Sequence, residues 1–303
     1  MSGSDPVAGV IGLGSMGMGA AQSAARAGLE SWGFDLRPEA GAALAAAGGH
    51  AAGSVADLAA RADVVLVYVV NAAQTRQVLA EAVPAARPGT VFVICVTMQP
   101  ADAEEICAGL TAAGMLAIDA PVSGGSLKAM AGEIAMMASG PEQAFDRAAA
   151  VLDAISATVF RLGGQPGAGA RMKTINQLLA GVHIAAAAEA LSLAAGMGMD
   201  LAEVHRVIQS CAGNSWMFAN RGAHVVAGDY TPHSAVDIFV KDLGIVTDAA
   251  RSAGMPTPLS DTALDLFRQA SAQGMGRLDD AAITLLLARR GGVRLAGDPE
   301  GTA

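Results

Sequence analysis

The feature that most constrains the fold is a repeated change of pattern in the first half of the chain. Short runs rich in β-branched and other apolar residues alternate with longer, alanine-rich stretches that have helical spacing. Such alternation indicates parallel βαβ units, so we expect the apolar runs to be strands of one parallel sheet. These predicted strands lie at 7–11, 30–35, 64–70, 90–96, 115–119 and 133–139.

The strand pattern stops after Gly169, and the chain from there to about Ala288 has the spacing of helices. The first helix is expected to span 170–197, about 42 Å at 1.5 Å per residue, which is long enough to link two domains. We therefore predict an α/β protein, with a parallel-sheet domain at 1–168 and an all-helical domain at 169–288 joined by this long helix. The Gly-rich segment 289–303 has no periodicity and is predicted to be disordered.

Charge and cysteine content exclude several classes of protein. The chain has 19 Lys and Arg against 28 Asp and Glu, for a net charge of −9, and it has no basic run, so nucleic acid is not an expected partner. The three cysteines lack metal-ligand spacing, so no metal site is predicted. The first residues lack the basic and apolar regions of a signal peptide, and we expect a cytoplasmic protein.

One apolar stretch, 178–195, approaches the length of about 20 residues that spans a bilayer. His183 and Glu189 interrupt it, and a charged residue near the bilayer centre is costly. We therefore predict a buried helix of a soluble protein and no membrane span.

A glycine-rich segment ends the first predicted strand and begins a helix, the context that a dinucleotide-binding turn requires. Gly12 would allow a tight turn, Gly14 would let the backbone approach a pyrophosphate, and Gly17 would let the helix pack on the strand. The alternative is a βα turn without a ligand. The predicted cofactor residues of this turn are Gly12, Leu13, Gly14, Ser15, Met16 and Gly17.

Asp35 closes the second predicted strand, near the position where an acid bonds the ribose hydroxyls of a dinucleotide. A carboxylate there repels a 2′-phosphate, which favours NAD over NADP. Arg37 is close enough in sequence to bind such a phosphate if the side chains rearrange. Alternatively, Asp35 only caps a turn.

A second cluster follows the strand at 115–119. Ser123, Gly124 and Gly125 offer a hydroxyl and unhindered N–H groups at a chain reversal, which suits a substrate carboxylate. Ser-Gly-Gly also forms ordinary loops, and the pattern alone leaves both interpretations open.

The long helix begins with a segment that carries Lys173 and Asn176, three residues apart and thus on one face. Oxidation of an alcohol needs a base for the hydroxyl proton, and a partly buried lysine can serve as one. Asn176 would orient the lysine or the substrate hydroxyl. The alternative for Lys173 is a solvated helix lysine. Lys241 is a second candidate cation, although Asp237, four residues earlier, could pair with it on the surface.

Four motifs in this order resemble the 3-hydroxyisobutyrate dehydrogenase, or β-hydroxyacid dehydrogenase, family over about 7–287. They are Gly12-x-Gly14-x-Met16-Gly17, the segment 119–125, Gly167-x-Gly169-x-x-x-Lys173-x-x-Asn176 and Lys241-Asp242-Leu243. The resemblance implies a Rossmann-type NAD-binding domain, a helical substrate and oligomerisation domain, and Lys173 as general acid/base supported by Asn176. It also implies that Ser123, Gly124 and Gly125 bind the carboxylate and that Val70, Asn71, Thr97 and Lys241 contact the cofactor.

Within that family, the segments 69–74, 177–185, 212–217 and 228–242 resemble the branch that oxidises L-threonate to 2-oxotetronate. The chain has Asn176 where that branch often has His, and Gln177 where the wider family commonly has a second Asn. The alternatives are a 3-hydroxyisobutyrate dehydrogenase, a tartronate semialdehyde reductase and, outside enzymes, an NAD-binding regulatory protein. The helical half leads us to expect a homodimer or homotetramer.

Overall fold

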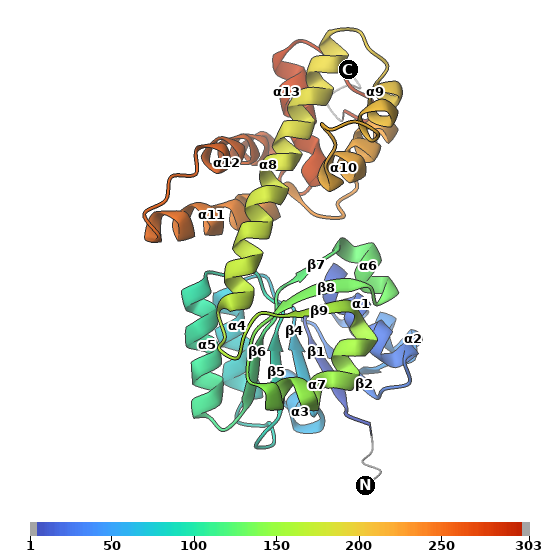
Figure 1. Ribbon diagram of the computed structural model, residues 1–303. Coiled ribbons are helices and arrows are strands. Elements are labelled where there is room, and N and C mark those ends of the chain that lie inside the picture. Colours follow the sequence, from blue (N-terminus) through green and yellow to red (C-terminus); the bar gives the residue numbers. More distant parts are fainter. Residues whose placement is uncertain (1–4, 299–303) are drawn as a thin grey trace. The chain divides into compact units, whose positions relative to one another are not determined.

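The computed structural model describes residues 5–298 (Figure 1). The chain forms two compact units, with the boundary between Lys173 and Thr174. This boundary lies within the long helix, a few residues after the predicted boundary at 168/169.

The first unit contains a parallel sheet with the strand order β3-β2-β1-β4-β5-β6. The order reverses between β1 and β4, so the connections that follow these two strands leave in opposite directions. In open α/β sheets the ligand crevice lies at the carboxyl ends of the strands beside such a switch point. The strands are β1 (Ala8–Ile11), β2 (Ser31–Phe34), β3 (His50–Ala51), β4 (Val64–Val67), β5 (Val91–Ile94) and β6 (Leu116–Asp119).

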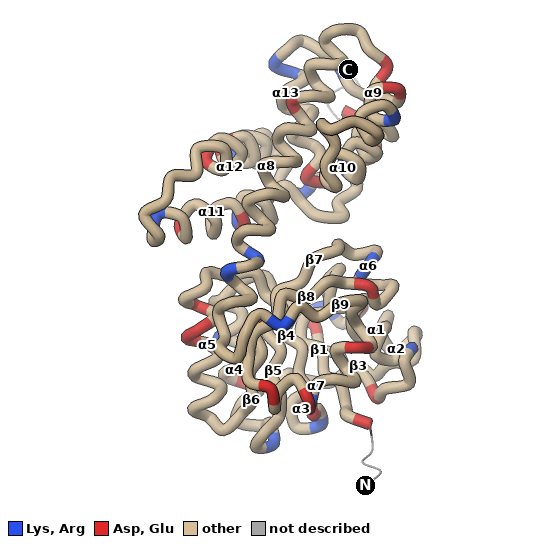
Figure 2. The backbone as a smooth tube through the Cα atoms, in the orientation of Figure 1, with Lys and Arg blue, Asp and Glu red and all other residues tan. Residues whose placement is uncertain are grey.

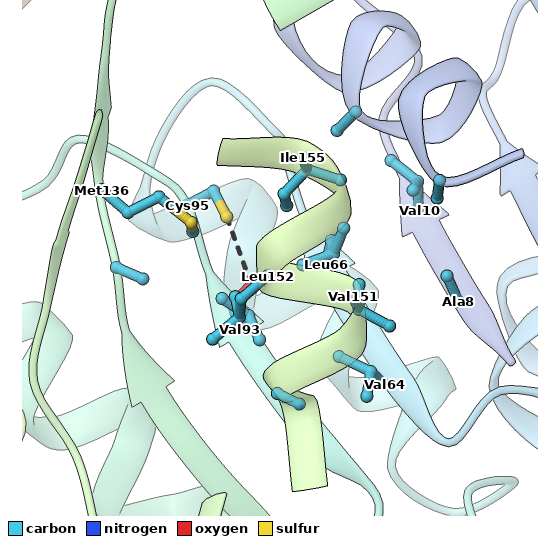
Figure 3. Close-up of a cluster of buried hydrophobic side chains, with 14 of the residues drawn as sticks. Ala8, Val10, Val64, Leu66, Val93, Cys95, Met136, Val151, Leu152 and Ile155 are labelled. Carbon is cyan, nitrogen blue, oxygen red and sulfur yellow. Dashed lines mark hydrogen bonds between the residues drawn. The ribbon is translucent and has the colours of Figure 1, made fainter. Parts of the chain in front are cut away.

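Helices cover both faces of this sheet, which explains why its strands are almost continuously apolar. Alternate residues point to opposite faces, so Leu66 packs in one buried cluster and Val67 in the other. Figure 3 shows Val151, Leu152 and Ile155 of α7 beside strand residues of the first cluster. That face is covered by α1 (Ser15–Arg26), α2 (Pro38–Ala46) and α7 (Glu142–Ile155), and the other by α3 (Val55–Arg61), α4 (Ala72–Ala82) and α5 (Pro100–Ala112).

A second, three-stranded sheet corrects one prediction. The run at 133–139, expected in the main sheet, forms β8 (Ile134–Ala138) of a sheet with the order β7-β8-β9. Ala120 and Pro121 separate β6 from β7, and the glycines with positive φ after β7 redirect the chain, so that β8 runs antiparallel to β7. The other elements here are β7 (Val122–Ser123), α6 (Gly125–Ala131) and β9 (Ser156–Arg161).

The second unit is helical, as predicted, and has its own apolar core. The rings of Phe239 and Phe267 stack with centroids 5.2 Å apart, and Gly181 allows Leu243 to pack closely against the long helix. The elements are α8 (Ala168–Gly196), α9 (Leu201–Ile208), α10 (Trp216–Ala227), α11 (Val236–Ser252), α12 (Pro258–Ala270), η1 (Ser271–Met275), η2 (Asp280–Ala282) and α13 (Ile283–Arg290).

The segment 289–303 was predicted to be disordered, but the structure describes a folded conformation for its residues up to Asp298. Helix α13 extends to Arg290, and Leu295 is buried in the helical core. Arg289 forms an ion pair with Asp298, which holds the segment against the helix. These contacts make 289–298 ordered, whereas 299–303 lie outside the described residues.

Helix α8 is long and apolar enough to cross a membrane by length and composition alone. A core helix of a soluble protein meets the same criteria, and 44% of the apolar window is buried. Among the described residues, acidic and basic side chains are interspersed in both units (Figure 2). The absence of a membrane span stays a prediction.

Candidate active site

The glycine-rich turn connects β1 to α1 at the switch point of the main sheet. Gly12 has φ +92°, and a Cβ there would overlap the carbonyl oxygen of Tyr68. A Cβ on Gly17 would overlap the carbonyl oxygen of Gly12, so the close approach of helix and strand requires glycine at both positions. Gly14, by contrast, faces open space with no atom within 4 Å of a built Cβ. This arrangement fits a pyrophosphate at the start of α1, because the backbone at Gly14 is open to an approaching ligand.

Asp35 lies directly after β2 and links the turn to the next loop. Its carboxylate accepts hydrogen bonds from the backbone N–H of Leu13 at 2.8 Å and that of Arg37 at 3.0 Å, and its Oδ1 pairs with Arg37 Nε at 3.0 Å. Burial alone would raise the pKa of Asp35, but the hydrogen bonds from Arg37 and Leu13 outweigh it and hold the pKa below its usual value. An ionised acid therefore stands beside the glycine-rich turn.

Three further predicted cofactor residues follow the carboxyl ends of β4 and β5. Val70 is exposed, and Asn71 caps α4 by accepting a hydrogen bond from the N–H of Gln74 at 2.9 Å. Thr97 is partly buried three residues beyond β5. The parallel strands thus bring these residues to the same edge of the sheet as the glycine-rich turn.

The second glycine cluster forms the predicted chain reversal between β7 and α6. Gly124 has φ +139° and Gly125 has φ +77°, backbone conformations that favour glycine. Ser123, the last residue of β7, is partly buried. The Ser-Gly-Gly loop therefore combines a partly buried hydroxyl with two glycines whose positive φ angles turn the chain, as the predicted carboxylate site requires.

Lys173 is buried, with 8% of its surface exposed, so it is not a solvated helix lysine. Its Nζ donates a hydrogen bond to the carbonyl oxygen of Val122 at 2.8 Å. Val122 immediately precedes Ser123, which places the amine beside the loop predicted to hold the substrate carboxylate.

The helical unit connects the other predicted residues by a series of polar contacts. Asn176 Nδ2 donates to Gln177 Oε1 at 2.9 Å, and Gln177 Nε2 donates to Asp242 Oδ2 at 2.6 Å. Lys241 pairs with the other oxygen of Asp242 at 2.7 Å, whereas Asp237 accepts a hydrogen bond from Ser271. Lys241 thus pairs with its neighbour Asp242, and the amide of Asn176 is held by Gln177.

Comparison with known proteins agrees with this arrangement. Residues 7–164 match the family model described as the NAD-binding domain of 6-phosphogluconate dehydrogenase. Residues 167–287 match the model described as NAD-binding of NADP-dependent 3-hydroxyisobutyrate dehydrogenase. The crystal structure of 3-hydroxyisobutyrate dehydrogenase from Salmonella typhimurium is 53% identical, with a TM-score of 0.89 over 93% of this chain and 100% of that one. The chain belongs to the 3-hydroxyisobutyrate dehydrogenase family.

Relatives in this family cover nearly the whole chain. The L-threonate dehydrogenase of Escherichia coli (strain K12) is 50% identical over 300 residues, 98% of each protein. The 2-(hydroxymethyl)glutarate dehydrogenase of Eubacterium barkeri is 30% identical over 293 residues, 95% of this chain and 97% of that protein. The chain is therefore a hydroxy-acid dehydrogenase with an NAD-binding domain.

For this member of the 3-hydroxyisobutyrate dehydrogenase family, the structure adds two features that the sequence did not predict. Asp119 lies within one of the family motifs, but its side-chain contacts come from two distant segments, Ser139 after β8 and Gly167 with Ala170 at the start of α8. In the sequence, Gln177 is notable only as a departure from the family pattern. Its hydrogen-bond partner Asp242 lies 65 residues away in the chain. Helical spacing reveals neighbours on one helix and does not reveal a partner on another.

Proposed function

We propose that this dehydrogenase oxidises L-threonate to 2-oxotetronate with NAD and that Lys173 is the general acid/base. Five L-threonate dehydrogenases, between 48% and 50% identical, support this substrate. The observation that carries the mechanism is the buried amine of Lys173, held at 2.8 Å from the Val122 carbonyl beside the Ser-Gly-Gly loop.

The residues of the chain divide the chemistry between them. The loop at Ser123, Gly124 and Gly125 holds the substrate carboxylate, which presents the neighbouring hydroxyl to the amine. Lys173 takes the hydroxyl proton in oxidation and returns it in reduction, and Asn176 orients the hydroxyl without adding charge. When bound, NAD supplies the hydride acceptor.

The cofactor is proposed to lie along the carboxyl edge of the main sheet, with its pyrophosphate at the start of α1. Asp35 would hold the ribose hydroxyls and disfavour NADP. Lys241 remains a proposed cofactor contact, with its ion pair to Asp242 fixing its position. The remaining proposed contacts are Gly12, Leu13, Gly14, Ser15, Met16, Gly17, Val70, Asn71 and Thr97.

We further propose a cytoplasmic homodimer or homotetramer that acts on a small carboxylate, with no nucleic-acid or membrane partner. The sheet unit, about 1–168, would bind NAD. The helical unit, about 169–288, would serve substrate binding and oligomerisation. Light scattering of the purified protein measures the subunit number, and a monomer would contradict this assembly.

Substitution of Lys173 tests the proposed role. Lys173→Ala is expected to bind NAD as tightly as the parent protein and to lose turnover by about 10²- to 10⁴-fold, the usual contribution of general acid–base catalysis. Arg171→Ala is the matched control, because this exposed side chain lies on the same helical turn and forms a surface ion pair with Glu104. Undiminished turnover in Lys173→Ala would exclude the assigned role.

A panel of acids tests the substrate. Turnover of L-threonate should exceed that of erythronate, 3-hydroxyisobutyrate and the reduction of tartronate semialdehyde. The second candidate is 3-hydroxyisobutyrate, because the Salmonella typhimurium structure named for that activity is 53% identical. Faster turnover of 3-hydroxyisobutyrate would favour that candidate, and NAD binding without turnover of any acid would favour a regulatory protein.

A further inference from the structure

Asp119 lies where the main sheet, the second sheet and helix α8 meet. It is the last residue of β6, with only 1% of its surface exposed. Its backbone exchanges two hydrogen bonds with Ser139, at 3.0 and 2.8 Å, which joins the end of β6 to the segment after β8. The backbone of Asp119 is thus held at this junction by two hydrogen bonds.

A single carboxylate oxygen of Asp119 holds the start of α8. Its Oδ2 accepts hydrogen bonds from the backbone N–H groups of Gly167 and Ala170, both at 2.9 Å, and from the Ser139 hydroxyl at 3.3 Å. The same hydroxyl accepts a hydrogen bond from the N–H of Gly169 at 3.1 Å. The first N–H groups of a helix have no partner within it, so Asp119 and Ser139 cap α8 from outside its own sequence.

The first turn of α8 also packs closely against the backbone at Met137 and Asp119. A Cβ added to Gly169 would overlap the carbonyl oxygens of Met137 and Asp119, so the helix can approach this corner only because glycine stands there. A small displacement of the cap therefore moves the first turn of α8 as a whole.

One turn beyond the cap, Lys173 returns to the same segment. Its Nζ bonds the Val122 carbonyl, and Val122 lies three residues after Asp119, just as Lys173 lies three residues after Ala170. The contacts form a closed ring from Asp119 along the chain to Val122, across to Lys173 and back down the helix to Ala170. Asp119 thus connects the helix turn that carries the Lys173 amine with the segment that leads to the loop at Ser123.

A helix cap alone does not require such a costly group, because neutral Ser, Thr or Asn side chains cap helices well. Burial raises the pKa of Asp119 above its usual value, although the hydrogen bonds from Ala170, Gly167 and Ser139 oppose this shift. Its Oδ1 is buried and has no hydrogen-bond partner among the described residues. The position therefore keeps a carboxylate at a cost to stability, which suggests a task beyond capping.

We propose that Asp119 is a positioning residue that sets the Lys173 amine at its working distance from the carboxylate-binding loop. This inference rests on the proposed function of Lys173 and adds a residue that would act only through it. Asp119 would touch neither substrate nor cofactor.

A double-mutant cycle tests the inference. Asp119→Ala is expected to lower kcat by about 10²-fold, the effect of misplacing a reacting group by about 1 Å, and to leave the affinity for NAD nearly unchanged. In a Lys173→Ala background the same substitution should cost little further, because the group that it positions is gone. Asp119→Asn, which keeps one acceptor oxygen for the helix, should recover part of the loss.

The control is Glu104→Gln, which removes the exposed ion pair from α5 to Arg171 in the first turn of α8 but leaves the cap intact. It should keep parental kcat. Thermal unfolding of each variant separates loss of fold from loss of positioning, and Asp119→Asn carries the test if Asp119→Ala does not fold. Equal losses of kcat from Asp119→Ala or Asp119→Asn in both backgrounds, or parental kcat in the folded variant, would overturn the inference. Undiminished turnover in Lys173→Ala alone would instead overturn the proposed function.

Discussion

At the scale of single residues, Asp35 and Arg37 form a pair that bears on the choice of cofactor. The Asp35 carboxylate accepts hydrogen bonds from the backbone N–H of Leu13 and from the side chain of Arg37. Arg37 also donates a hydrogen bond to the Leu13 carbonyl oxygen at 3.2 Å. More than half of the Arg37 side chain is exposed. The guanidinium is therefore available near the ribose position if the acid that holds it is removed.

Asp35→Ala should shift preference toward NADP, because it removes the charge that repels a 2′-phosphate and releases Arg37. A hydrogen bond to a charged group contributes about 1.5–3 kcal/mol, so the ratio of kcat/KM for NADP to that for NAD should rise by at least about tenfold. Adding Arg37→Ala should remove the part of the gain that depends on the guanidinium. Asp57→Ala, which breaks a comparable exposed pair with Arg61, is the control. An unchanged ratio in Asp35→Ala would contradict the argument.

The residues that sequence could identify are those whose roles depend on local spacing. Gly12 and Gly17 are required by the turn itself, and helical spacing places Lys173 and Asn176 on one face, whereas the contact of Lys173 with Val122 spans 51 residues and comes only from the structure. The roles of Asp119 and Gln177 could not be predicted, because each depends on contacts with segments at least 20 residues away. Tertiary packing decides which distant segments meet, and a single sequence does not reveal that packing.

At the scale of elements, the start of α8 packs closely against fixed backbone oxygens. Gly169→Ala should lower the free energy of unfolding by about 1–3 kcal/mol, because its methyl group meets fixed backbone oxygens. Gly109→Ala, within α5 and with open space around its Cβ, is the control and should be neutral or stabilising by up to about 1 kcal/mol. Chemical denaturation of both variants measures the difference, and equal stabilities would contradict the close contact.

Elements were predicted where an apolar run was bounded by turns. The strands from β1 to β6, except the two-residue β3, were anticipated with small differences at their ends. The run at 133–139 is a strand, as predicted, but it belongs to the second sheet. The sheet was mispredicted because periodicity does not specify a strand's neighbour. The strand β9 was not predicted, since it follows α7 without an intervening turn and is mostly exposed.

At the scale of the whole molecule, each unit has its own apolar core, and the proposed cofactor residues other than Lys241 belong to the sheet unit. NAD at 100 times its dissociation constant should stabilise the protein by about 2.7 kcal/mol. Gly14→Ala should leave the stability of the protein without NAD unchanged, because its Cβ meets no atom within 4 Å, yet it should reduce the stabilisation by NAD. Thermal unfolding with and without NAD measures both, and full stabilisation in Gly14→Ala would place the pyrophosphate elsewhere.

The proposed mechanism depends on proton transfer by the amine of Lys173, and chemical rescue tests this step directly. NADH formation from L-threonate by Lys173→Ala is measured while small primary amines of increasing basicity are added. We predict that the amines restore part of the lost rate, that the restored rate varies with amine pKa, and that the parent protein and Arg171→Ala show no such gain. Parental NADH formation by Lys173→Ala without any amine would contradict the account.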